Sequence, residues 1–305
     1  MDMTVEQNVG YQAITYAQHK SIRLNDADYC YLEAGEGPML LLLHGYPDNA
    51  YSWEQQIRFL SAAGYRVIVP FLRGYQPTHV ATGSFFDRAT IANDMSVLID
   101  KLNDSAPVLL VGQDWGAAIS YGILGAFSEK VTRAMILAVP HTLEINRTLK
   151  RSPKHCFRSF HWFLFQLPWL PELIIRGSRG RFLSFLWKLW SPKFSDQKHV
   201  DHIIKTLLWG NGVEDTLAYY RAAVQAKFRD PRLSGLFERL NDTITVPTKV
   251  LCGKKDMRKE MLPRAADCFA ESADYQWELV EDAGHFLHRE KPEVINQAIL
   301  HWFKQ

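Results

Sequence analysis

The chain has 305 residues, which is long enough for one large α/β domain with an insertion and argues against two equal domains. Its 35 Lys and Arg nearly balance 33 Asp and Glu, giving a net charge of +2, so charge does not indicate a nucleic acid or an acidic partner. Four cysteines without C-x-x-C or Cys/His ligand spacing predict no metal site, and no cofactor is expected.

The beginning of the chain lacks the features of a targeting segment. Residues 1–20 show no basic stretch followed by an apolar one, so we expect no signal sequence. The longest apolar run near the front, Met39–Leu43, is too short to span a bilayer. These features predict a reduced, cytoplasmic setting without an integral membrane segment, and they leave the oligomeric state open.

Short apolar runs rich in β-branched residues alternate with longer segments of helical period. This alternation predicts an α/β fold in which helices cover a mostly parallel sheet. Strands are expected at Met39–Leu43, Arg66–Pro70, Val108–Val111, Ala134–Val139, Lys249–Cys252 and Gln276–Val280. Helices are expected at Tyr51–Ala63, Ala89–Leu102, Trp115–Ala126 and Pro292–Phe303, the last begun by a proline in its first turn.

The alternation stops between His141 and about Asp242, where helical patches and aromatic residues replace strands. This pattern predicts a helical cap domain at 141–242, inserted into a core domain made of 1–140 and 243–305. Residues 160–190 are unusually aromatic, which is compatible with packing, with the wall of an apolar pocket or with membrane contact. Prolines and charges interrupt every long apolar run there, so packing and pocket lining are favoured.

The sequence V-G-Q-D-W-G at residues 111–116 follows a predicted strand and opens a predicted helix. It has the G-x-nucleophile-x-G pattern of a nucleophile elbow, with Asp114 in the middle. A carboxylate there would be held ionised by the helix N-terminus and could attack a saturated carbon, forming an ester. The alternative is that Asp114 only caps the helix, since aspartate is a favoured N-cap residue.

Three further motifs follow predicted strands in an order that supports the nucleophile. H-G-Y-P-D at residues 44–48 predicts a loop whose Tyr46 N–H, together with that of Trp115, forms an oxyanion hole. Asp256 follows a late strand and is placed to orient a histidine, and His285 in A-G-H-F is the general-base candidate. The chain order is nucleophile, acid, histidine, and each residue lies at a strand end.

The chain resembles the epoxide hydrolase and haloalkane dehalogenase branch of the α/β-hydrolase superfamily. The resemblance runs from about Tyr29 to Phe303 and rests on G-Q-D-W-G, H-G-Y-P and the cap segment at residues 166–172. It implies the α/β-hydrolase fold with an inserted cap and disfavours serine esterases, because Asp114 occupies their serine position. It also implies a pocket that includes His44, Pro47, Trp162 and Tyr219.

In epoxide hydrolases two cap tyrosines usually donate to the epoxide oxygen. By its place before an arginine, Tyr220 matches one of them, with Tyr219 as the neighbouring alternative. Counting back from Gln166, the other position falls on His161, so the resemblance implies a His–Tyr pair. Such a pair still donates hydrogen bonds if His161 carries its proton on the facing nitrogen, although His161 is also compatible with packing alone.

Dehalogenases remain an alternative because they place a halide-binding tryptophan where Trp115 stands, as epoxide hydrolases often do too. Residues 161–162 with Tyr220 also resemble the halide pocket of fluoroacetate dehalogenases. Those enzymes hold a carboxylate with arginines where this chain has Trp115 and Ala118, so a haloacetate is the least favoured substrate.

A catalytically inactive binding protein is the third alternative, but such relatives usually lose the nucleophile or the histidine. The sequence therefore predicts a hydrolase that opens a small, uncharged, lipophilic epoxide to a diol through an ester on Asp114.

Overall fold

The computed structural model describes residues 14 and 16–304. The expectation that no signal sequence occurs in residues 1–20 therefore falls mostly outside the described residues. In the described part, nine strands form one sheet in the order β1-β2-β4-β3-β6-β7-β8-β9, with β5 paired to β2. Their bounds are β1 (Gln18–Leu24), β2 (Ala27–Ala34), β3 (Met39–Leu43), β4 (Arg66–Pro70), β5 (His79–Val80), β6 (Val108–Gln113), β7 (Val131–Leu137), β8 (Thr248–Gly253) and β9 (Tyr275–Val280).

The sheet is parallel over most of its width. The pairs β4–β3, β3–β6, β6–β7, β7–β8 and β8–β9 are parallel, whereas β2 runs antiparallel to β1, β4 and β5. Every residue of β3 is buried, as expected for a central strand covered on both faces. The predicted α/β-hydrolase fold with a mostly parallel sheet is confirmed.

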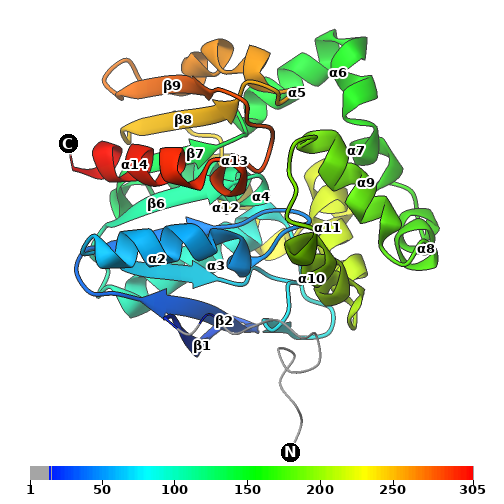
Figure 1. The fold of residues 1–305 in the computed structure, drawn as a ribbon, viewed down its shortest axis with the longest axis horizontal. Coiled ribbons are helices and arrows are strands. Elements are labelled where there is room, and N and C mark those ends of the chain that lie inside the picture. The colour runs from blue at the N-terminus through cyan, green and yellow to red at the C-terminus, as the bar shows by residue number, and fades with distance from the viewer. Residues whose placement is uncertain (1–13, 15, 305) are drawn as a thin grey trace, which may run out of the picture.

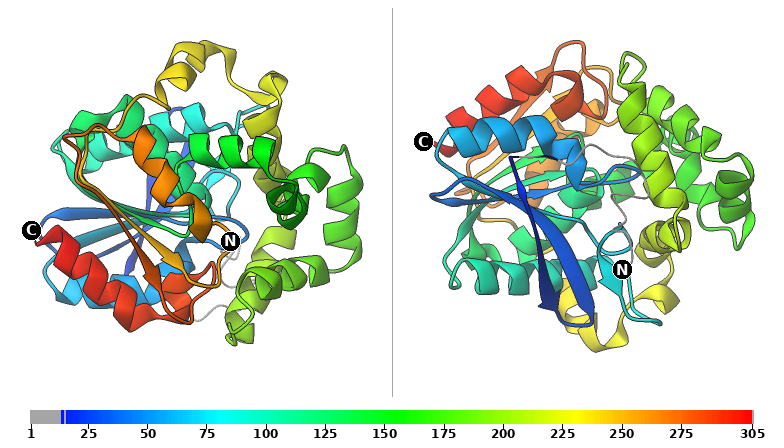
Figure 2. Two further views of the ribbon diagram at one scale, coloured as in Figure 1. Left: turned by 90° about the horizontal axis from the view of Figure 1, so that it is seen from above. Right: turned by 60° about the horizontal axis from the view of Figure 1, so that its bottom comes forward.

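Helices cover both faces of the sheet (Figure 1). Helices α2 (Glu54–Ala62), α13 (Leu287–Glu290) and α14 (Pro292–Phe303) lie on one face, and α3 (Arg88–Leu102) and α4 (Trp115–Ala126) on the other, which the view from above shows as two layers (Figure 2). A buried salt bridge at 2.5 Å joins Arg73, after β4, to Asp94 of α3. It ties a loop at the edge of the sheet to the helix layer.

Several predicted elements match the structure residue for residue, namely Met39–Leu43, Arg66–Pro70, Trp115–Ala126 and Pro292–Phe303. The predicted helix Tyr51–Ala63 is instead a short 3-10 turn, Ala50–Trp53, followed by α2. The predicted strand Ala134–Val139 is wrong at both ends, since β7 is Val131–Leu137. It stops there because Ala138 has φ 68°, in the left-handed region that strands do not use.

The segment between β7 and β8 contains helices and turns but no named strand among residues 141–242, all of which are described. Its helices are α5 (Thr142–Arg151), α6 (Pro153–Arg158), α7 (Phe160–Leu164), α8 (Leu170–Gly177), α9 (Arg181–Trp190), α10 (Gln197–Leu208), α11 (Gly212–Val224) and α12 (Ser234–Arg239). Figure 1 shows α6 to α10 along the edge of the molecule beside the sheet. The last helix of the segment, α12, contacts α3 and α4 of the core, so the predicted domain boundary at 242/243 stays a prediction.

Candidate active site

Asp114 occupies the sharp turn between β6 and α4. Its backbone has φ 51° and ψ −115°, a conformation that costs a non-glycine residue about 1–3 kcal/mol. The side chain makes no capping hydrogen bond to α4, which contradicts the alternative of a simple helix cap. Instead, Oδ1 accepts a hydrogen bond from the Tyr46 N–H at 2.8 Å.

Three glycines make this turn sterically feasible. A Cβ at Gly112 would lie 2.3 Å from Ser120 Oγ, and one at Gly116 would lie 2.1 Å from the Leu43 carbonyl oxygen. A Cβ at Gly45 would lie 2.6 Å from Asp114 Oδ1 and 2.7 Å from the Trp115 nitrogen. The H-G and G-x-D-x-G motifs are therefore packing requirements of the elbow itself.

The structure brings the three predicted triad residues together from the ends of β6, β8 and β9. His285 Nε2 lies 3.1 Å from Asp114 Oδ2, and His285 Nδ1 lies 2.7 Å from Asp256 Oδ2. All three are buried, with Asp114 the most exposed at 8%. The histidine thus bridges two carboxylates inside the protein.

Charge coupling within this triad outweighs the cost of burial. Burial alone would raise the pKa of both carboxyls, but their hydrogen bonds to His285 and the charge of Arg258 hold the pKa of Asp114 and of Asp256 below its ordinary value. Burial likewise acts to lower the pKa of His285, and its contacts with the two carboxylates reverse this and raise it. Asp114 is therefore ionised at neutral pH.

Tyr220 faces this site from α11. Its ring lies 5.0 Å from that of Trp115 and 5.4 Å from that of Tyr46, both nearly perpendicular. Burial, reinforced by the charge of Asp114, raises its pKa well above the ordinary value, so the phenol remains protonated and can donate.

The other candidate tyrosine lies elsewhere. The hydroxyl of Tyr219 donates to the Arg73 carbonyl at 2.7 Å, and its side chain is not among those lining the cavities described below. The structure therefore separates two adjacent tyrosines that the sequence could not distinguish.

The ring of His161 lies 6.0 Å from that of Tyr220 and 4.9 Å from that of Trp190, measured between ring centroids. Its buried Nδ1 has no hydrogen-bond partner in the described part of the chain. Burial lowers its pKa to about 3, so the ring is neutral. It does not line the cavities described below, and its role stays a prediction.

Two expected pocket residues support the loops instead. His44 Nε2 accepts from the Leu72 N–H at 3.1 Å, and burial lowers its pKa to about 4. This neutral ring holds two loops together and does not line the cavity at Asp114. Pro47 lines a separate small cleft beside Tyr75. These positions do not agree with the expectation that His44 and Pro47 line the substrate pocket.

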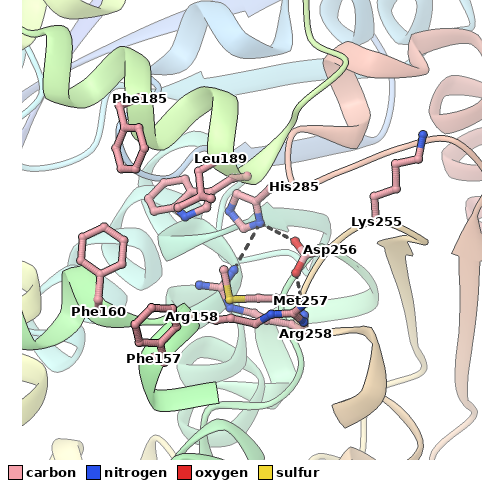
Figure 3. Close-up of a pocket in the computed structure, with 11 residues that line it drawn as sticks. Phe157, Arg158, Phe160, Phe185, Leu189, Lys255, Asp256, Met257, Arg258 and His285 are labelled. Atoms are coloured by element: carbon pink, nitrogen blue, oxygen red, sulfur yellow. Dashed lines mark hydrogen bonds and ion pairs between the residues drawn. The ribbon is translucent and has the colours of Figure 1, made fainter. Parts of the chain in front are cut away.

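Two cavities reach residues of the triad, and Arg258 lines both of them. The first, here called the elbow cavity, has a volume of about 300 Å³ and reaches Asp114. It is lined by Trp115, Trp162, Tyr220 and cap residues from α5, α7 and α11. The second, here called the cap pocket, has a volume of about 360 Å³ and reaches His285 and Asp256 between α6 and α9 (Figure 3).

Arg258 lines both cavities and was not predicted. Its backbone N–H donates to Asp256 Oδ1 at 2.7 Å, and its guanidinium Nη1 lies 3.3 Å from His285 Nδ1. Because Nδ1 donates its proton to Asp256 at 2.7 Å, it cannot also accept a hydrogen bond from Arg258. The arginine therefore acts on His285 through its positive charge, which works to lower the pKa of the histidine. The spacing D-x-R after the strand is the signal that could have found it.

Residues 40–298 match the model of the alpha/beta hydrolase family. The chain belongs to this family. Among its relatives, Epoxide hydrolase 4 of Homo sapiens is 26% identical over 302 residues, covering 94% of this chain and 79% of that protein. Epoxide hydrolase 3 of Xenopus tropicalis is 28% identical over 301 residues, covering 95% and 79%.

Solved structures show the same fold. This alpha/beta hydrolase superposes on epoxide hydrolase CorEH with a TM-score of 0.79 at 23% identity, covering 94% of this chain and 99% of that one. Cfl2 from Burkholderia cenocepacia gives 0.82 at 21% identity, covering 96% and 98%. Within its described residues, this hydrolase has no helix long and apolar enough to cross a membrane and no cluster of three or more His, Cys, Asp or Glu arranged to hold a metal.

Proposed function

We propose that this alpha/beta hydrolase opens small lipophilic epoxides to vicinal diols through a covalent ester on Asp114. The observation that carries the proposal is an aspartate at the elbow, with one oxygen on the Tyr46 N–H and the other against His285. An aspartate ester suits attack on a saturated carbon. The names of the epoxide hydrolase relatives support this substrate class.

In the first step, Asp114 Oδ2 attacks an epoxide carbon and the carbon–oxygen bond of the ring breaks. The leaving oxygen takes the phenolic proton of Tyr220, with the neutral ring of His161 as the expected second donor. Oδ1 is already held by the Tyr46 amide, so it becomes the ester carbonyl oxygen in the oxyanion hole formed with the Trp115 N–H.

In the second step, His285 takes a proton from water, and the resulting hydroxide attacks the ester carbonyl carbon. As the tetrahedral intermediate collapses, the former Oδ2 oxygen leaves with the diol and takes the proton of the attacking hydroxide, so Asp114 returns to a carboxylate that carries one water oxygen. The proton held by His285 passes to the Tyr220 phenolate and restores the phenol. Esterification also removes the carboxylate of Asp114, whose hydrogen bond with His285 is one cause of the raised pKa of that histidine. The first step thereby prepares the histidine to act as a base in the second.

A haloalkane dehalogenase is the second candidate because Trp115 and Trp162 both line the elbow cavity, with rings 5.6 Å apart. Two indole N–H groups would suit a halide. Tyr220 favours the epoxide, since a protonated phenol next to the nucleophile serves an alkoxide that must gain a proton.

A parallel product assay separates the candidates. The purified protein would receive aryl and alkyl epoxides in one set, and bromoalkanes, chloroalkanes and fluoroacetate in another. Asp114→Ala serves as the blank and the exposed Asp242→Ala as the matched control. Diol without halide, lost only in Asp114→Ala, is the expected result. Halide without diol would mean that the tryptophans bind a leaving halide. The absence of both products would favour a binding protein.

A further inference from the structure

The cap carries most of the exposed large apolar side chains of the described chain. Seven of twelve lie between residues 157 and 189, with Phe157 at 84% and Trp169 at 69% exposure. We call these seven the cap rim: Phe157, Phe163, Leu167, Trp169, Leu173, Phe185 and Leu189. They come from α6 to α9 and the adjoining turns, which Figures 1 and 2 both show at the edge remote from α14. Such clustering marks an interaction surface, whereas isolated exposed apolar residues do not.

The same segment is strongly basic. Residues 145–190 contain nine Lys or Arg and one acid, a net charge of +8, whereas the rest of the chain has 26 basic and 32 acidic residues, a net charge of −6. Within the described residues, six of these cations form no ion pair. They are Lys150, Arg151, Arg158, Arg179, Arg181 and Lys188. The balanced total charge thus conceals a cationic cap on an acidic core.

Helix α9 shows how charge and apolar surface are combined. Its inner face buries Leu183, Leu186, Trp187 and Trp190. Its outer face, at i, i+4, i+7 and i+8, exposes residues 181, 185, 188 and 189, which are Arg, Phe, Lys and Leu. Apolar tips beside long cationic side chains are typical of a helix that lies in the headgroup region of a membrane.

The cap pocket opens within this surface. Phe157, Phe185 and Leu189 of the cap rim also line the pocket, whose inner end is formed by His285 and Asp256 (Figure 3). An apolar molecule leaving a bilayer at the rim would therefore enter a cavity that leads to the triad.

We propose that the cap rim docks this hydrolase onto an anionic lipid surface, from which lipophilic substrate enters the cap pocket. Charge complementarity selects the occupant: a +8 segment fits a surface of negative headgroups, and separate apolar tips insert between them. A protein partner would instead require an interface core depleted of charge. The route of substrate entry rests on the proposed function, whereas the docking itself does not.

The test is sedimentation of the full chain with vesicles of phosphatidylcholine alone or mixed with phosphatidylglycerol. We expect binding to the mixed vesicles, weakened about tenfold or more by high salt because exposed charges are screened. Two double variants, together called the rim variants, lie outside the lining of the cap pocket. One changes two apolar residues of the cap rim, Trp169→Ser with Leu173→Ser, and the other changes two cations beside it, Arg181→Glu with Lys188→Glu. Each should reduce binding by about tenfold or more. The matched control on the opposite side, Val294→Ser with Lys304→Glu on and after α14, should bind like the unaltered protein.

Hydrolysis of a water-soluble epoxide should be unchanged in both rim variants, which separates docking from chemistry. The proposal is overturned if the unaltered protein does not bind the mixed vesicles, or if rim and control variants bind equally well. It is also overturned if the rim variants change only the oligomeric state, because the surface would then join two copies. Vesicle binding without any diol formation would refute the proposed function and leave the docking intact.

Discussion

Mild acid is expected to destabilise this hydrolase strongly, because five buried histidines are held neutral in the folded chain. Burial is the largest cause in each case and lowers the pKa to about 3 or 4 from an ordinary value of 6.5. A histidine whose pKa is depressed by folding adds stability above pH 6.5 that is lost as the pH falls toward the folded value. The five are His44, His141, His161, His202 and His288.

The size of the effect follows from the width of this window. One pH unit below the unfolded pKa, each such histidine costs about 1.4 kcal/mol, so five cost about 7 kcal/mol at about pH 5.5. His285 acts in the opposite direction, since its raised pKa adds stability below pH 6.5. The loss of about 7 kcal/mol from the five histidines, which His285 partly offsets, is comparable to the whole free energy of unfolding of an ordinary domain.

Urea denaturation at steps between neutral pH and about pH 5 would measure this loss. His141→Asn removes one buried ring and keeps an acceptor for the Leu143 N–H that His141 now binds at 3.3 Å. Its stability should fall less steeply with acid, by about 1.4 kcal/mol per pH unit, whereas the exposed control His79→Asn should retain the original slope. A stability that is flat or rises between neutral pH and about pH 5.5 would refute the reasoning.

Four further outcomes are expected. Tyr220→Phe should lower kcat/KM for an epoxide about 100- to 1,000-fold without changing the urea midpoint, and His161→Phe should lower kcat/KM less. If Tyr220→Phe were as active as the unaltered protein, Tyr220 would have no part in the reaction. His285→Gln should accumulate protein heavier by one epoxide in intact-mass spectra, and a protein of unchanged mass would argue against an ester. In pH–rate profiles, the acid limb of kcat should lie at higher pH than the acid limb of kcat/KM. Hydrolysis of the ester needs a neutral His285, whereas the first attack needs only an ionised Asp114, whose pKa is depressed. Gly45→Ala should cost about 1–3 kcal/mol in urea denaturation because its Cβ would crowd Asp114, and a neutral effect would contradict the close packing of the elbow.

The buried strands and the residues at their ends could be predicted because strands of a parallel sheet have continuous apolar runs that are easily recognised in a sequence. The run Met39–Leu43 is apolar throughout because both faces of β3 are covered. The edge strand β1, Gln18–Leu24, was not predicted, since five of its seven residues are exposed and its side chains carry little hydrophobic signal. The triad candidates could be found because each follows a strand and parallel strands end at one edge.

The side chains of the cap could not be oriented from sequence. Tyr219 and Tyr220 are adjacent and both buried, and only the tertiary contact of Tyr219 with the Arg73 carbonyl decides which one faces Asp114. The contact in which His44 accepts from the Leu72 N–H could likewise not be predicted, because it joins loops 28 positions apart. Such contacts depend on how helices and loops pack, which periodicity does not encode.

The central claim, a covalent ester on Asp114, is tested most directly by one turnover in ¹⁸O-labelled water with enzyme in excess over epoxide. The account predicts an unlabelled diol, since its new oxygen comes from Asp114, together with ¹⁸O in the peptide that contains Asp114. A diol that carries ¹⁸O after one turnover, with an unlabelled peptide, would show direct attack by water and contradict the account.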